Sequence, residues 1–78
     1  MKDLLTYLAR NLVDHPDAVE VEVEEQDDEV LLTLTVDDRD MGRVIGRDGR
    51  IANTLRSLLR VMGTRAGRRV ELEIVGND

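Results

Sequence analysis

The sequence predicts an α+β domain in which helices cover one face of a three-stranded sheet, in the order α-β-β-α-α-β. Apolar and polar residues alternate in residues 18–25, 30–36 and 70–74, which is typical of half-buried strands. In residues 3–13 and 49–62 the apolar residues recur at the spacing of an amphipathic helix. At 78 residues the chain has room for one domain, spanning residues 1–78.

The first helix is predicted over residues 3–13. Its leucines fall within about 100° of arc at helical period: Leu4, Leu5, Leu8 and Leu12. Asp3 is suited to cap its start, and Pro16 ends it because proline disfavours helical geometry in the residue before it. His15 lies in the linker that follows, where we expect no catalytic role.

The first two strands should form an antiparallel hairpin that turns at residues 26–29. The inward-facing residues are apolar: Val19, Val21 and Val23, then Val30, Leu32, Leu34 and Val36. A third strand of the same design follows near the C-terminus, with Val70, Leu72 and Ile74 facing inward. The opposite face is acidic, since it carries Glu20, Glu22, Glu24, Glu71 and Glu73.

About 30 residues lie between the second and third strands, which is enough for a helical crossover. Asp37–Asp40 offers a cap and first-turn acids for a short helix that runs through Ile45 and stops at Gly46. A longer helix begins near Gly49, and Gly63 is its predicted C-cap. Its apolar arc comprises Ile51, Leu55, Leu58, Leu59 and Met62, and the opposite side carries Arg50, Asn53, Arg56 and Arg60.

Charge is distributed unevenly along the chain. Residues 1–38 carry 2 basic and 12 acidic side chains, whereas residues 39–69 carry nine arginines and two aspartates. The local charge of the second segment is therefore +7 in a protein whose net charge is −6. Association depends on the local field, so this segment is a candidate surface for an anionic partner. Solvated helix faces are the alternative interpretation.

Composition excludes several function classes. The chain has no Cys and one His, so we expect no disulfide, no metal centre and no cofactor. It has no phosphate-binding Gly-x-x-x-x-Gly-Lys-[Ser/Thr] motif and no nucleophile–base pair, so we expect no enzyme. Phe and Trp are absent, which excludes aromatic platforms for stacking bases. An acidic N-terminal stretch without a long apolar run predicts a cytoplasmic protein.

Residues 42–51, Gly-Arg-Val-Ile-Gly-Arg-Asp-Gly-Arg-Ile, join the two crossover helices through a Gly-x-x-Gly turn. Without a Cβ the backbone turns sharply and lets a sugar-phosphate chain approach, and the amides that open the next helix face anions. Arg47 and Arg50 add guanidinium groups that suit phosphate. A hinge between two helices explains the same glycines structurally.

The run from Val44 to Arg50, after a hairpin and before an amphipathic helix, resembles the KH domain, and the element order resembles its type II form. The resemblance implies that the Gly-x-x-Gly loop clamps the backbone of about four single-stranded nucleotides. The implied RNA-binding residues are Gly46, Arg47, Asp48 and Gly49 in the loop, with Arg43, Val44, Ile45, Arg50 and Asn53 beside it and Ile51 in a lesser role. Asp48 departs from the expected chemistry, because an acid repels phosphate.

A free-standing KH domain with this Leu12–Pro16 segment is similar to the KhpA family of small bacterial proteins. That resemblance implies an RNA chaperone that pairs with a larger KhpB-like KH protein in control of cell elongation and envelope homeostasis. A protein-interaction module with incidental nucleic-acid binding is the alternative. We expect a homodimer or heterodimer, with Met41, Val61 and Met62 as candidate interface residues.

Overall fold

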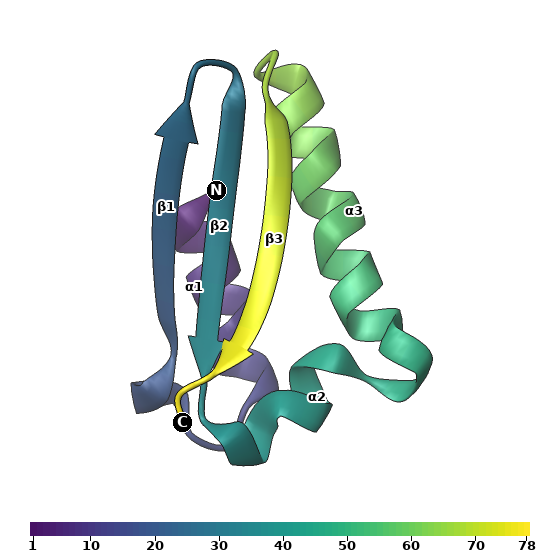
Figure 1. The fold of residues 1–78 in the computed structure, drawn as a ribbon. Helices are drawn as coiled ribbons and strands as arrows, with labels where there is room; N and C mark the ends of the chain where they lie inside the picture. The colour runs from purple at the N-terminus through teal and green to yellow at the C-terminus, as the bar shows by residue number, and fades with distance from the viewer.

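The computed structural model describes residues 1–78, and Figure 1 shows their arrangement. The helices and strands are α1 (Lys2–Leu12), β1 (Glu20–Gln26), β2 (Glu29–Val36), α2 (Met41–Ile45), α3 (Arg50–Arg65) and β3 (Arg69–Gly76). Short 3₁₀ turns lie at Pro16–Ala18, Asp38–Asp40 and Arg47–Gly49. The predicted α+β class and the α-β-β-α-α-β order are confirmed.

The sheet has the strand order β1-β2-β3, so β2 is its central strand. β1 and β2 form the predicted antiparallel hairpin, in which Val21 pairs with Leu34. β3 pairs with β2 in parallel, with Leu32 opposite Leu72. This is possible because α2 and α3 carry the chain back to the end of the sheet where β2 begins. In Figure 1, α1 passes behind β1 and β2, whereas α3 runs along the side of β3.

The core lies between the sheet and the helices. It contains Leu5, Ala9, Val19, Val21, Val30, Leu32, Leu34, Val36, Val44, Leu55, Leu59, Val70 and Leu72. Four of these side chains come from β2, and each is at most 2% exposed. Burial of one such aliphatic side chain stabilises the fold by about 1.5–3 kcal/mol. The central strand is therefore the element onto which the helices pack.

The structure corrects the predicted start of α1 and end of α3. α1 begins one residue before Asp3, which lies in the first helical turn instead of capping it. α3 continues past Gly63 to Arg65, and Gly67, with a φ of 70°, makes the turn that follows. Gly63 is buried, and a Cβ there would lie 2.7 Å from the carbonyl oxygen of Arg68. This glycine therefore allows the chain that leaves α3 to approach the helix closely.

The outer face of the sheet is acidic, as the alternation predicts. The register places Glu22, Thr33 and Glu73 side by side across the three strands, so that glutamates of β1 and β3 flank the central strand. All five glutamates of this face are exposed. Like charges repel, so a phosphate chain is disfavoured on this face.

No helix combines the length and the apolar character needed to cross a membrane. No group of three or more His, Cys, Asp or Glu side chains is arranged to hold a metal ion.

Candidate nucleic-acid interface

A tight turn at Gly46–Gly49, here called the clamp turn, joins α2 to α3. Gly46 ends α2 with a φ of 76° and donates its N–H to the carbonyl oxygen of Gly42 at 2.9 Å. Asp48 and Gly49 are also in the left-handed region, with φ values of 56° and 75°. Three positive φ values in four residues reverse the chain sharply, so the turn forms an exposed loop at the start of α3.

Two features of the sequence fix this geometry. A Cβ at Gly46 would lie 2.7 Å from Cγ1 of Ile51, so the first turn of α3 packs directly against the backbone of the clamp turn. Aspartate tolerates the left-handed region better than most residues, which accounts for Asp48 at a position where a β-branched residue would be strained. Asp48 thus suits the backbone conformation of the turn, although its charge is unfavourable for phosphate.

Polar side chains of the predicted site lie together around the clamp turn. Arg47, Arg50 and Asn53 are all exposed. Arg50 and Asn53 are three residues apart on α3, so they share one face of its first turn. Arg50 and Asn53 therefore lie on one exposed surface, next to the turn that carries Arg47.

Ion pairing divides the nine arginines of residues 39–69 into two groups. Four pair with carboxylates within 4.0 Å, namely Arg39 with Asp37, Arg43 with Asp14, Arg68 with Glu25 and Arg69 with Glu29. The other five form no ion pair, and they are Arg47, Arg50, Arg56, Arg60 and Arg65. Uncompensated positive charge is therefore concentrated on the clamp turn and on α3.

One side of α3 faces the free edge of β3. Arg56 is half-buried there, and its Nε donates to the carbonyl oxygen of Leu72 at 3.4 Å. Arg60 is one turn further along the helix, on the same side. We call the surface formed by Arg50, Asn53, Arg56 and Arg60 the arginine side of α3. It adjoins the clamp turn, so a chain of phosphates can follow both.

The apolar residues of the predicted site differ in how far they are buried. Val44 is fully buried in the core, so its side chain supports the clamp turn from below and exposes no surface to a base. Ile45 is 37% exposed at the end of α2. Ile51 is half-buried against Gly46. Of the three, Ile45 therefore offers the most apolar surface to a base.

Arg43 lies on α2 but is engaged with neighbouring carboxylates. Its guanidinium contacts Asp14 at 2.9 Å, and its Nε lies 4.0 Å from Asp40. Asp40 is 1% exposed and accepts hydrogen bonds from the His15 ring at 2.9 Å and from the His15 amide at 3.0 Å. Of the predicted RNA-binding arginines, Arg43 is therefore the one with competing partners. His15, which the sequence placed in a linker without a catalytic role, belongs to this network.

Acid should weaken the fold through Asp40. Burial alone would raise the pKa of Asp40, but hydrogen bonds from the His15 ring and from the amides of Asp14 and His15 outweigh it. Its pKa therefore lies below the ordinary value of 3.8, and the unfolded chain takes up the proton first as the pH falls. The stabilisation by the ionised Asp40 carboxylate is complete at pH values above its ordinary pKa, which applies to the unfolded chain. It is lost as the pH falls through the lower pKa of Asp40 in the folded protein.

We expect the free energy of unfolding to fall more steeply for the wild-type protein than for Asp40→Asn between about pH 5 and about pH 2. Urea denaturation of both proteins across this range measures the difference. Parallel curves would contradict the assignment of Asp40 as a group that stabilises the fold in its ionised form.

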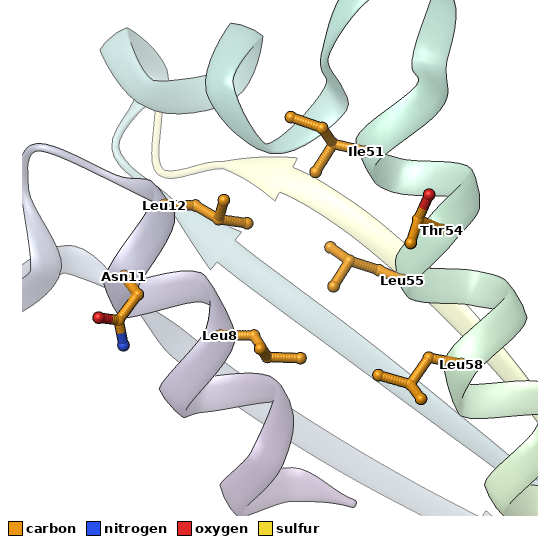
Figure 2. A pocket seen from close by; sticks show the side chains of 7 residues that line it. All are labelled: Leu8, Asn11, Leu12, Ile51, Thr54, Leu55 and Leu58. Atoms are coloured by element: carbon orange, nitrogen blue, oxygen red, sulfur yellow. The ribbon is translucent and has the colours of Figure 1, made fainter.

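A second surface lies on the side of α3 that is opposite to the arginine side. There an apolar groove runs between α3 and α1. Figure 2 shows Leu8 and Leu12 of α1 pointing towards Ile51, Leu55 and Leu58 of α3. Asn11 and Thr54 complete a lining around a volume of about 360 Å³.

Three large apolar side chains of α1 and α3 are exposed to solvent, and of these Leu58 lines the groove. Leu58 is 40% exposed, Val61 55% and Tyr7 64%. The sequence placed Leu58 in the core arc of its helix, and the structure places it at the rim of the groove instead. Of the candidate interface residues, Val61 is exposed, whereas Met41 and Met62 are half-buried.

A family model described as KhpA/KhpB, KH domain, matches residues 2–74 and so includes the clamp turn and both helices beside it. The chain belongs to this family. Relatives that carry the name RNA-binding protein KhpA match almost end to end. The protein from Listeria monocytogenes is 40% identical over 75 residues, which is 96% of this chain and 99% of the relative. The membership inferred from the clamp sequence is confirmed.

Two further relatives carry the same name. The protein from Aquifex aeolicus is 43% identical over 75 residues, covering 96% of this chain and 95% of the relative. That from Bacillus subtilis is 38% identical over 74 residues, covering 95% and 91%. In each comparison the similarity to KhpA therefore extends over nearly the whole length of both chains.

A solved structure shares the fold. It is the crystal structure of Era in complex with MgGDPNP and nucleotides 1506-1542 of 16S ribosomal RNA, which matches with a TM-score of 0.53 and 21% sequence identity. The match covers 96% of this chain but 29% of the Era chain. At this identity the likeness supports the fold alone.

Proposed function

We propose that this KH-family chain binds single-stranded RNA at the clamp turn and along the arginine side of α3. One observation carries the proposal: the arginines without acidic partners lie on a Gly-x-x-Gly turn with left-handed residues and along the 16-residue helix that follows it. The names of the KhpA relatives support the choice of RNA as the ligand. The chain acts as a binding module and not as an enzyme.

The geometry supplies two kinds of contact. The exposed backbone of Gly46–Gly49 lets the sugar-phosphate chain approach closely, and Arg47 and Arg50 donate to phosphate oxygens. The apolar surface of Ile45 lies beside the turn and accepts a base, whereas Ile51 packs against Gly46 and lines the groove towards α1. Asp48 lowers the local positive charge, and Arg43 contributes only when phosphate competes with Asp14. Val44 holds the turn in place from the core.

Salt dependence tests this mode of binding. A clamp that engages about four nucleotides neutralises few phosphates, so the slope of log affinity against log salt should be about −2 to −3. The chain has no Phe or Trp to stack bases, so we expect weak sequence preference and affinity weaker than nanomolar for one domain. Fluorescence anisotropy with a short labelled RNA measures both. Nanomolar binding that is independent of salt would contradict the proposal.

We further propose that the apolar groove between α1 and α3 is where the chain dimerises, with a second copy or with a KhpB-like KH protein. Leu58 exposes apolar surface in the groove, and Tyr7 and Val61 are exposed on the two helices that form it. The groove lies on the opposite side of α3 from Arg56 and Arg60. A dimer formed through this face keeps the arginine sides of both protomers free. Two clamps on one RNA then raise the apparent affinity without new contacts in either domain.

Family membership supports a wider role of the same kind. We propose an RNA chaperone in the cytoplasm that acts with a KhpB-like partner in post-transcriptional control of cell elongation and envelope homeostasis. The groove also favours the second candidate, a protein-interaction module in which RNA binding is incidental. A charge reversal in the clamp turn that leaves partner binding and cellular activity intact would favour this second candidate.

A further inference from the structure

α2 is the element that carries the clamp turn, and it is too short to be stable alone. It has five residues, Met41–Ile45, and Gly46 follows it directly. An isolated helix of this length is far below the roughly 12–15 residues needed for stability in water. Its position, and with it the position of the clamp turn, must therefore be set by contacts with other elements.

The strongest polar contact at the start of α2 is made by Asp40. Its carboxylate is 1% exposed and accepts three hydrogen bonds, from the amide of Asp14 at 3.2 Å, the amide of His15 at 3.0 Å and Nδ1 of His15 at 2.9 Å. All three donors belong to the segment that leaves α1, which is 25 or 26 residues away in the sequence. Asp40 thus ties α2 to the N-terminal part of the chain.

An acidic residue at the N-cap position normally forms hydrogen bonds with its own helix. An Asp that precedes a helix caps it by accepting from the amides of the first turn. Here the side chain of Asp40 makes no such bond, although the residue occupies the N-cap position of α2. The carboxylate points instead to the exit of α1. Its bonding capacity is used for a contact between elements.

Arg43 adds a second connection between the same two segments. It lies one helical turn after Asp40 and pairs with Asp14 at 2.9 Å, although both side chains of this pair are more than half exposed. Exposed pairs contribute little to stability. The buried bonds of Asp40 therefore carry most of the connection.

We propose that Asp40 and His15 are positioning residues for RNA binding: they hold α2 against the exit of α1 and thereby fix the clamp turn in the geometry that RNA requires. The inference rests on the proposed function, because it assigns these residues to the same site. Neither side chain is expected to touch RNA. His15 is half-buried and Asp40 is covered, so their effect passes through α2.

Two substitutions of His15 test the proposal with little risk to the fold. His15→Ala removes the ring donor but leaves both backbone bonds to Asp40, whereas His15→Asn keeps a side-chain N–H near the position of Nδ1. We expect His15→Ala to weaken RNA binding about fivefold to tenfold, since the loosened turn must be ordered again on binding. His15→Asn should restore wild-type affinity. Asp40→Asn should weaken binding at least as much as His15→Ala.

The readouts separate positioning from stability. Amide NMR signals of Gly46 and Gly49, recorded without RNA, should shift in His15→Ala and return in His15→Asn. Val21→Ala is the matched control, because it removes core contacts in β1, which packs against α1 and β2, and should lower thermal stability without moving these signals. Affinities are compared at a temperature at which every variant is folded.

Unchanged Gly46 and Gly49 signals in His15→Ala, or an unchanged affinity, would overturn the inference. Equal losses of affinity in His15→Ala and Val21→Ala would also overturn it, because they would show a general effect of stability. A wild-type protein that binds no RNA would refute the proposed function, and the amide signals would still decide whether His15 positions the turn.

Discussion

Arg47→Asp is expected to reduce RNA affinity by about 30-fold, because it removes a charged donor to phosphate and leaves two adjacent acids in the clamp turn. Arg47 is exposed and forms no ion pair, so the variant should unfold at the same temperature as the wild type. Gel-shift titration or anisotropy with a short single-stranded RNA measures the change. The complementary variant Asp48→Asn removes the acid from the turn and should raise the affinity a few-fold.

Arg65→Asp is the matched control for this experiment. It makes the same change of net charge, but it lies at the last residue of α3, at the far end of the helix from the clamp turn. The two variants therefore separate a local contact from the overall field. Equal losses in Arg47→Asp and Arg65→Asp, or full RNA binding by Arg47→Asp, would contradict the assignment of the clamp.

Leu58→Asp is expected to weaken dimerisation by at least about 100-fold, because a carboxylate placed at the centre of an apolar interface loses its hydration without gaining a partner. Leu58 lines the groove and is 40% exposed, so the substitution should be tolerated by the monomer. Light scattering or sedimentation at micromolar concentration should detect a dimer of the wild type and an 8.8 kDa monomer of the variant.

Ser57→Asp is the control for dimerisation, since it places the same charge at an exposed neighbouring position outside the groove. It should remain a dimer. A wild-type chain that stays an 8.8 kDa monomer at every concentration would refute self-association and leave the KhpB-like partner as the proposed occupant of the groove.

Periodicity sufficed to predict the elements, because a strand that is buried on one face and a helix that is buried on one stripe leave different spacings in the sequence. The clamp turn was found for a related reason: Gly46 and Gly49 are needed locally, within a few residues of the contacts that require them. Arg47, Arg50 and Asn53 followed from the same local pattern.

Contacts between distant residues were missed. A helical arc does not tell whether a neighbouring element covers Leu58, and its exposure became evident only once α1 was placed beside α3. A glycine near the end of a helix pattern usually marks a C-cap, so Gly63 was predicted to end α3. Its actual role is to let the chain near Val70 approach the helix, and the local sequence pattern does not show that contact. The bonds of Asp40 to His15 join segments 25 residues apart, and no spacing rule connects them.

The central claim is that RNA occupies the clamp turn and the arginine side of α3. Titration of the ¹⁵N-labelled chain with a short single-stranded RNA, followed by amide NMR, tests it most directly. We expect the signals of residues 46–50, Asn53, Arg56 and Arg60 to shift first, while those of the glutamate-bearing sheet face stay in place. Shifts concentrated on β1, or on the groove residues Leu8 and Leu58 with an unperturbed clamp turn, would contradict it.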